Sequence, residues 1–297
     1  MIGFNGGLIG GLATARNTSS DPSVSGVWTL PEQRKAKLAN TWPTAGAKLL
    51  DTYGGASVAY SLRLLSTAYS GSLVTVRRAS DDTTQGFTEA QIIGSGAGSL
   101  ADFCSGTNGF VRTWYDQSGN GNNATQATPA NQPQIFTSAS GSVELTNTKP
   151  CIKYTSNDKW LTFGTRLTNV ISTFQVCKLD TVDGIKPLLG DTTTFDYHGG
   201  TSTWLDASLS AAEVRNGSNR INNVISTLQS TSKSTSQVLI SMINTGSTEV
   251  STISRDRTEA GRNWTGTFQE LIIYNSSKSS DASAINGTIN LHYSIYV

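Results

Sequence analysis

Short runs of alternating apolar and polar residues recur along most of the chain. Beyond residue 130 they return roughly every 8–12 residues and are separated by Gly, Ser, Thr and Asn. An alternation with a period of two is typical of strands that bury one face. Many short strands at this spacing, with turn residues between them, predict an all-β protein of the sandwich class.

One strand pattern leads into the most distinctive loop of the chain. Residues 110–115 alternate, and residues 116–123 are then Asp, Gln, Ser, Gly and Asn. The glycines permit a positive φ, and the Asp and Asn side chains can bond the nearby backbone. Two interpretations stay open here: a tight turn that fixes strand register, or a cation or sugar site formed by Asp116, Asn120 and Asn122. The loop lacks the alternating ligands and distal Glu of an EF-hand.

The two ends of the chain carry different patterns. Residues 266–274 include the apolar run Leu-Ile-Ile of a buried strand, and Asp281 then precedes a pattern of apolar residues at helical spacing. At the other end, residues 26–43 predict a helix, because Thr29 and Glu32 have the spacing of a capping box. We therefore expect an N-terminal arm and helix over residues 1–45 and one large domain over residues 46–297.

The N-terminal arm contains apolar residues that are unusual in a free tail. Two interpretations stay open: a disordered tail, or a peptide that orders against a partner or a neighbouring subunit. For the tryptophans of the following helix, packing onto the large domain and attachment to a particle are both consistent with the pattern. The docking candidates are Phe4, Leu8, Ile9, Trp28 and Trp42.

Composition narrows the classes of partner. Charged residues make up 14% of the chain and the formal net charge is +1. Because this provides no basic excess to neutralise phosphates, nucleic acid is excluded as the main partner. No apolar run approaches the length of a membrane span, and the first residues lack the pattern of a secretory signal.

The cysteines and histidines give no sign of a metal centre. Cys104, Cys151 and Cys177 are widely spaced, and the two histidines, His198 and His292, are not clustered with them. We expect buried free thiols, with a single disulfide as the alternative. We expect no cofactor and assign no metal ligands, although the oxygens of the 116–122 loop leave calcium open. Neither histidine belongs to a recognisable Ser/His/Asp arrangement.

Several segments between residues 59 and 136 resemble, in the same order, the start of the α-L-arabinofuranosidase B catalytic domain of fungi. Versions of this domain also occur in phage virion proteins. The resemblance implies a two-sheet, concanavalin-like (jelly-roll) β-sandwich, and residues 266–274 are similar to the final strand of laminin-G and concanavalin-like domains. The matching segments are residues 59–63, 68–71, 76–87, 100–104, 115–122 and 124–127.

The resemblance also implies where catalytic residues would lie. The nucleophilic Glu of the family falls near Glu213, and its acid falls near Asp256 or Glu259. The residues around Glu213 do not reproduce the family motif, and its pair of adjacent cysteines is missing. A family cysteine that pairs with the equivalent of Cys104 is replaced here by Gly109, which suits a protein that folds in a reducing cytoplasm. Glu213 and Glu259 are therefore weak catalytic candidates.

Carbohydrate binding without catalysis is a further hypothesis. Lectin sites stack an aromatic face on a sugar ring and bond its hydroxyls with amides and carboxylates. Core or rim packing is the alternative for each aromatic residue. The candidates are Trp160, Tyr197, Trp204 and Trp264.

Taken together, these patterns lead us to expect a non-enzymatic structural protein of a tailed-phage virion. The pattern of residues 26–43 is similar to a module near the N-terminus of phage structural proteins. It would attach a homo-oligomer to other virion proteins of the tail, neck or capsid, after assembly in the host cytoplasm. The sandwich would be displayed, with a host surface glycan as a ligand. The alternative is a retaining glycoside hydrolase, α-L-arabinofuranosidase-like, acting on host surface polysaccharide.

Overall fold

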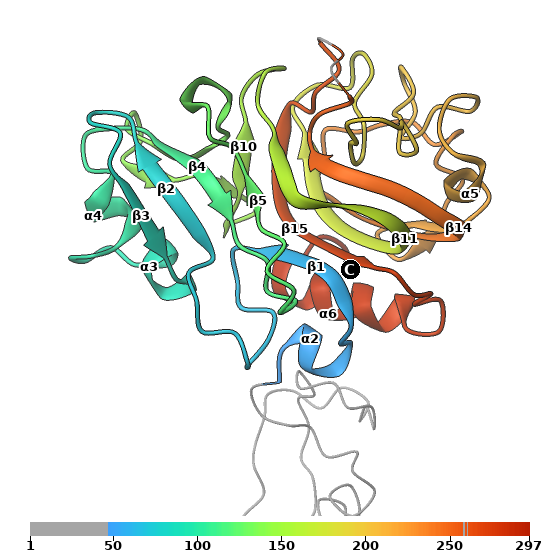
Figure 1. Cartoon of the computed structure of the whole chain (residues 1–297), viewed down its shortest axis with the longest axis horizontal. Coiled ribbons are helices and arrows are strands. Elements are labelled where there is room, and N and C mark those ends of the chain that lie inside the picture. Colours follow the sequence, from blue (N-terminus) through green and yellow to red (C-terminus); the bar gives the residue numbers. More distant parts are fainter. Residues whose placement is uncertain (1–46, 258, 260) are drawn as a thin grey trace, which may run out of the picture.

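The computed structural model describes residues 47–257, 259 and 261–297. These residues form an all-β body with a few short helices and one longer C-terminal helix (Figure 1). The helices are α2 (Leu49–Thr52), α3 (Glu89–Ile93), α4 (Leu100–Phe103), α5 (Ala212–Arg215) and α6 (Ala282–Tyr293), with a 3-10 turn at Pro129–Asn131. The strands are β1 (Ala56–Ser61), β2 (Val74–Arg78), β3 (Thr84–Phe87), β4 (Gly109–Trp114), β5 (Ala124–Thr125), β6 (Gln134–Thr137), β7 (Ser142–Val143), β8 (Leu145–Thr146), β9 (Lys149–Pro150), β10 (Ile152–Tyr154), β11 (Leu161–Leu179), β12 (Ser218–Ile221), β13 (Val224–Ile225), β14 (Val238–Ile253) and β15 (Gly266–Tyr274).

Six antiparallel strands close into a barrel. Strand β15 pairs with β10, β10 with β6, β6 with β4, β4 with β5, β5 with β11, and β11 pairs again with β15. The prediction of a two-sheet, concanavalin-like jelly-roll sandwich is therefore wrong. Strand spacing predicted the strands, but the pairing of β11 with both β5 and β15, which closes the ring, depends on contacts far apart in sequence.

Further strands extend the barrel on several sides. Strand β1 pairs with β15, β2 pairs with β4 and with β3, and β7 pairs with β6. On the other side, β14 pairs with β11 and is followed by β12 and β13. Strand β11 has 19 residues and β14 has 16, and register shifts interrupt their pairing. These two long strands carry the loops in which the candidate site lies (Figure 1).

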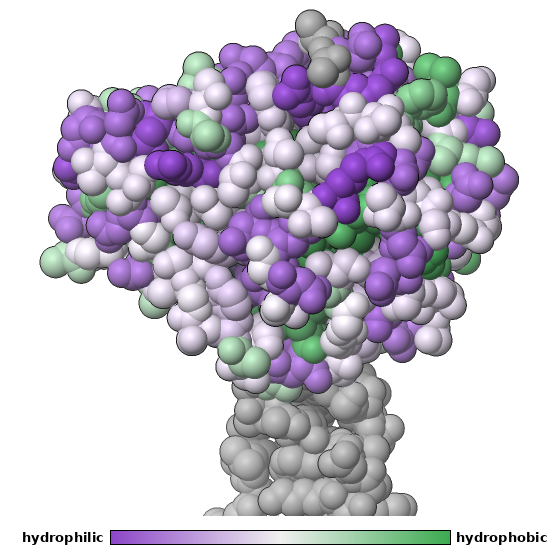
Figure 2. Space-filling view, viewed as in Figure 1, coloured by the Kyte–Doolittle hydropathy of each residue, from purple (hydrophilic) through white to green (hydrophobic). Residues whose placement is uncertain are grey.

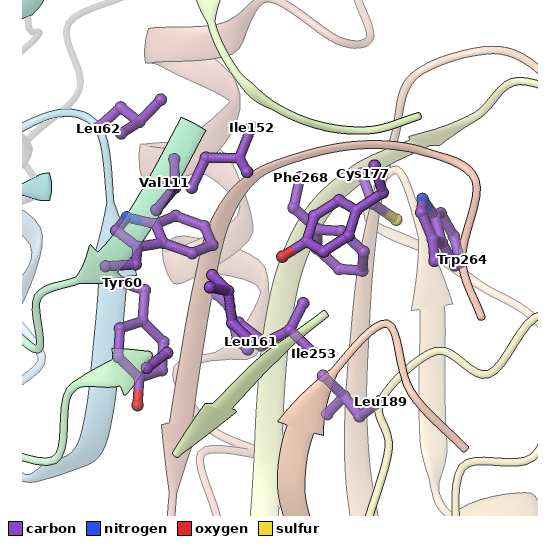
Figure 3. Packing of buried hydrophobic residues seen from close by; sticks show 14 of the residues in the cluster. Tyr60, Leu62, Val111, Ile152, Leu161, Cys177, Leu189, Ile253, Trp264 and Phe268 are labelled. Carbon is purple, nitrogen blue, oxygen red and sulfur yellow. The ribbon is translucent and has the colours of Figure 1, made fainter. Parts of the chain in front are cut away.

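The core has two parts, one on each face of β15. All nine residues of β15 are buried, as its apolar run predicted. The larger part includes Trp264 and Phe268, whose ring centroids are 5.0 Å apart, beside Cys177 (Figure 3). The smaller part packs against α6 through Ile285 and Ile289. On the face shown in Figure 2, apolar side chains form separate small patches among polar ones.

The helix predicted after Asp281 is confirmed as α6, although the Asp281 side chain makes no capping hydrogen bond. Ser99 Oγ caps α4 by accepting a bond from the backbone N–H of Asp102 at 3.1 Å. In contrast, residues 213–216, one of the short strand signals beyond residue 130, do not form the expected strand, since α5 lies there. Four residues are too few for periodicity to separate a helical turn from a strand. No helix among the described residues is long and apolar enough to cross a membrane.

The three cysteines are free and buried, which confirms the expectation of buried thiols. A Cβ placed on Gly109 would lie 2.7 Å from the Sγ of Cys104. A cysteine at position 109, as in the family that the sequence resembles, would therefore face Cys104. A sulfur at position 109 would come within bonding reach without a large backbone movement.

We expect Gly109→Cys to form a disulfide with Cys104 under oxidising conditions and to raise the free energy of unfolding by about 2 kcal/mol. The value is the loss of chain entropy expected for closing a loop of about six residues. Crowding against Phe136 and Val76, whose nearest atoms would be 3.1 Å from the new Cβ, opposes it. Urea unfolding with and without dithiothreitol measures the gain, and the Cys104→Ser, Gly109→Cys variant is the control. Two alkylatable thiols at these positions after oxidation would contradict the prediction.

Candidate functional site

The loop after β4 uses its polar side chains to tie the chain to itself. The carboxylate of Asp116 accepts bonds from the backbone N–H groups of Ala59 (2.9 Å), Ser118 (2.9 Å) and Asn122 (3.1 Å), and from Ser118 Oγ (2.7 Å). The Asn120 side chain donates to the carbonyl of Ala56 at 2.9 Å. Both Asp116 oxygens thus have protein donors, an arrangement that favours the turn over a cation site.

Asn122 extends this loop to the start of the long strand β11. Its Nδ2 donates to the carbonyl of Thr165 at 2.8 Å, and its Oδ1 accepts from the Thr165 N–H at 2.7 Å. The loop therefore fixes β1, β4 and β11 relative to one another. Calcium binding here stays a prediction, as does the expectation that the protein has no cofactor.

Three of the four aromatic candidates for sugar binding are in the core. Tyr197, Trp204 and Trp264 are almost completely buried, and the two tryptophan rings stack on each other with centroids 6.5 Å apart. They present no face to a ligand, because packing covers them. Trp160 differs, since it is only partly buried and lines a pocket.

This pocket has a volume of about 560 Å³ and lies between the start of β11 and the loop that follows β14. It brings together two predicted residues, Trp160 and Glu259, whereas Glu213 lies outside it. The guanidinium of Arg255 lies over the Trp160 ring, 4.1 Å from its centroid. The lining residues are Ser156, Asn157, Asp158, Trp160, Arg255, Glu259, Gly261 and Asn263.

Glu213 belongs to a separate group of acidic side chains over β14. It lies on α5 and packs so closely on β14 that a Cβ on Gly246 would be 3.0 Å from its Cγ. The segment before it is bonded to Asp196, because the N–H of Ala211 donates to the Asp196 carbonyl at 2.9 Å. The Asp196 carboxylate in turn accepts from the N–H of Glu249 on β14, at 2.8 Å.

Only some of the carboxylates in this group are paired with an arginine. Arg166 binds Asp191 at 2.8 Å and Glu249 at 2.5 Å, while Asp196 and Glu213 have no ion-pair partner among the described residues. Burial raises the pKa of the half-buried Asp196 carboxyl, and the charges of Glu249, Asp191 and Glu213 raise it further against the opposing Glu249 N–H. Asp196 thus keeps its proton up to a higher pH than an unperturbed Asp does.

Asp256 has the opposite environment. Its carboxylate is buried, with His198 Nδ1 at 3.1 Å and Arg257 Nε at 3.0 Å. Burial alone would raise the pKa of Asp256, but His198 and Arg257 outweigh it and hold that pKa below its ordinary value. Asp256 is therefore a poor proton donor, even though the resemblance implies an acid near this position. The neighbouring N–H of Arg257 donates to the Asp191 carbonyl at 2.8 Å, which joins this segment to the acidic group.

Sequence reasoning missed Asp196, Glu249, Asp191 and Arg166. No motif marks them, and they come from three separate parts of the chain: Arg166 from β11, Glu249 from β14, and the two aspartates from the segment between β11 and α5. The docking candidates Phe4, Leu8, Ile9, Trp28 and Trp42 lie outside the described residues.

Residues 52–153 match the family model of the α-L-arabinofuranosidase B catalytic domain. Two curated relatives match within this part of the chain. The α-L-arabinofuranosidase B of Emericella nidulans is 43% identical over 76 residues, which are 25% of this chain and 15% of that protein. An α-L-arabinofuranosidase of Hypocrea jecorina is 40% identical over 67 residues, or 23% of this chain and 13% of that protein. The match thus spans less than a sixth of either relative.

Solved structures of the same kind of enzyme are also similar. A mutant GH54 α-L-arabinofuranosidase soaked with 4-nitrophenyl α-L-arabinofuranoside gives a TM-score of 0.47 at 16% identity, covering 82% of this chain and 63% of that one. An arabinofuranosidase complexed with arabinofuranosyl-α-1,2-xylobiose gives a TM-score of 0.41 at 14% identity, with the same coverage.

These matches overturn the prediction of a non-enzymatic virion protein. The matched family model and the two relatives named above are those of α-L-arabinofuranosidases, so the expected virion partners, virion location and host-attachment role are wrong. The prediction relied on the pattern of residues 26–43 and on the missing motif around Glu213. Neither outweighs a match that extends over residues 52–153.

Proposed function

We propose that this chain is a glycoside hydrolase that releases L-arabinofuranosyl groups from a polysaccharide. The match of residues 52–153 to the arabinofuranosidase B catalytic domain carries the proposal. The acidic group over β14 supports it, because it offers two carboxyls without ion-pair partners among the described residues, one of them with a raised pKa. Glycosidases use such a pair, one as acid and the other as nucleophile or base.

In the proposed reaction, Asp196 is the acid and Glu213 is the nucleophile. Asp196 gives its proton to the glycosidic oxygen while a Glu213 oxygen attacks the anomeric carbon, so that the bond to the leaving alcohol breaks and a glycosyl ester forms. Water then attacks the same carbon, Asp196 takes a proton from it, and Glu213 leaves as a carboxylate. Arg166 balances the charges of Asp191 and Glu249, which limits the repulsion around the Glu213 anion.

Trp160 is the aromatic candidate that can still bind a sugar. Its partly exposed ring borders the pocket, together with the amides of Asn157 and Asn263. The Arg255–Arg257 segment runs from this pocket to the acidic group. We propose that the pocket holds a part of the polysaccharide away from the bond that is cleaved.

Hydrolysis of 4-nitrophenyl α-L-arabinofuranoside by the full chain tests the proposal. We expect release of 4-nitrophenol and arabinose, with much slower release from the α-D-glucopyranoside and β-D-xylopyranoside. Absence of arabinose release from both the aryl glycoside and an arabinose-substituted xylan would contradict the proposal.

The raised pKa of Asp196 predicts the basic side of the pH profile. A general acid acts only while protonated, so kcat/KM should stay high below the pKa of Asp196 and fall as pH rises through it. Since that pKa lies above the ordinary value of 3.8, the fall should begin at a higher pH than for an unperturbed Asp. Measuring kcat/KM against pH checks this, and the basic-side fall should be absent from the residual activity of Asp196→Asn. An unchanged fall in that variant would assign the acid to another residue.

A further inference from the structure

Within the part of the chain that the structure describes, the pocket beside Trp160 is lined by one cationic side chain, that of Arg255. The Arg255 guanidinium lies over the Trp160 ring, 4.1 Å from its centroid, and among the described residues Arg255 has no ion-pair partner. A guanidinium stacked on an aromatic ring keeps its N–H groups free at the edge, where they can bind a carboxylate in a bidentate manner. We propose that this pocket binds the carboxylate of a uronic acid residue, so that the enzyme prefers acidic polysaccharides. The proposal rests on the proposed function only in taking the ligand to be a saccharide.

A second cation lies beneath the same pocket. Lys186 is 6% exposed, and its ammonium donates to Asn157 Oδ1 and to the Asn263 carbonyl, both at 3.2 Å. Both acceptors belong to residues that line the pocket. Within the described part of the chain these are its two hydrogen-bond acceptors, both neutral, so one of its three protons is left over. The carboxylate of Asp183 acts on the ammonium through its charge but does not hydrogen-bond to it. A carboxylate in the pocket would accept that proton and oppose the charge.

The pocket also contains two acidic residues, Asp158 and Glu259, which differ in whether their negative charge is already paired. Asp158 is already bound by Lys159 Nζ at 2.8 Å and by Ser156 Oγ at 2.5 Å. Glu259 is exposed, and its carboxylate has no ion-pair partner among the described residues. The Glu259 charge should therefore repel an anionic ligand. Removing that charge should strengthen the binding of an anion, and this can be tested.

The position of Arg255 is fixed by its backbone. The Arg255 carbonyl accepts from Thr252 Oγ1 at 2.7 Å and lies so close to Gly190 that a Cβ there would be 1.6 Å from it. Ser254, directly before Arg255, and Arg257, two residues after it, have positive φ values of 79° and 53°. Non-glycine residues adopt this conformation only where the surroundings impose it. The guanidinium is thus held over Trp160 before any ligand binds, and little ordering is needed on binding.

Calorimetric titration with galacturonic acid trimer and with its methyl ester tests the proposal. The two ligands differ mainly in charge, and the Glu213→Gln protein is used so that no turnover interferes. We expect the acid to bind about tenfold more tightly than the ester, and to bind more weakly at high salt. Equal binding of acid and ester, or no binding of either, would overturn the proposal.

Variants of the pocket test whether the carboxylate of the ligand is what Arg255 recognises. Arg255→Gln should weaken binding of the acid about tenfold and leave binding of the ester unchanged. Arg112→Gln, which removes an exposed arginine on β4, is the matched control and should change neither.

Glu259→Gln should strengthen binding of the acid a few-fold, because it removes the negative charge that repels the ligand. Weaker binding of the acid in this variant would contradict an anionic ligand. Binding of the acid by a protein inactive on arabinofuranosides would remove the proposed function and leave this inference standing.

Discussion

Glu213→Gln and Asp196→Asn are each expected to lower kcat/KM for arabinose-substituted xylan about 10³-fold or more. The amide introduced by Glu213→Gln cannot form the glycosyl ester, and the amide introduced by Asp196→Asn cannot protonate the departing alcohol. The two losses should differ with the leaving group. The 4-nitrophenolate leaves without protonation, so Asp196→Asn should lose far less on 4-nitrophenyl α-L-arabinofuranoside than on xylan. Glu213→Gln should lose activity on both.

Initial rates on the two substrates, with and without azide, measure this difference. Azide can replace the missing carboxylate as a small nucleophile, so arabinofuranosyl azide should form in either variant. Glu144→Gln is the matched control, since burial also raises the pKa of Glu144 but its charged neighbours are Lys153 and Asp180 rather than the group over β14. It should keep its activity. Full activity in both Glu213→Gln and Asp196→Asn would move catalysis away from this group.

The strands were predictable because their signals are local. The run of residues 266–274 marks β15, whose side chains are all buried, and the Asp, Gly and Asn residues after Trp114 mark the loop that ends β4. Barrel closure was not predictable. It depends on β11 meeting β5 at Thr162 and Phe163 and β15 along most of its second half, and no local pattern encodes those pairings.

The candidate site was predictable only in part. The resemblance pointed to Glu213, and an aromatic residue in a loop pointed to Trp160. Asp196 gave no signal, because its raised pKa depends on burial and on the charges of Glu249, Asp191 and Glu213, which come from other elements. Conversely, Tyr197 and Trp204 have the residue types of a sugar site, but the fold buries them. Residue type alone does not separate a stacking surface from a core.

Breaking the buried ion pair of Arg63 and Glu270 should strongly destabilise the protein. Glu270 lies on β15 and is completely buried, and Arg63 binds it through two hydrogen bonds of 2.8 and 2.9 Å. Ser61 Oγ on β1 and the Tyr293 hydroxyl on α6 donate to the same carboxylate at 3.0 and 3.2 Å. The pair therefore joins β1, β15 and the C-terminal helix at one point.

Arg63→Met is expected to lower the free energy of unfolding by about 3–5 kcal/mol, because it leaves the Glu270 charge buried without a cation. Adding Glu270→Gln should restore much of this loss, since a neutral amide oxygen still accepts from Ser61 and Tyr293. Urea unfolding of the four proteins of this double-mutant cycle gives the coupling energy. Lys153→Met, which breaks the exposed pair with Asp180, is the control and should cost at most about 1 kcal/mol. An Arg63→Met loss no larger than this control would mean that the Glu270 charge is compensated from elsewhere, and the second substitution would then bring no recovery.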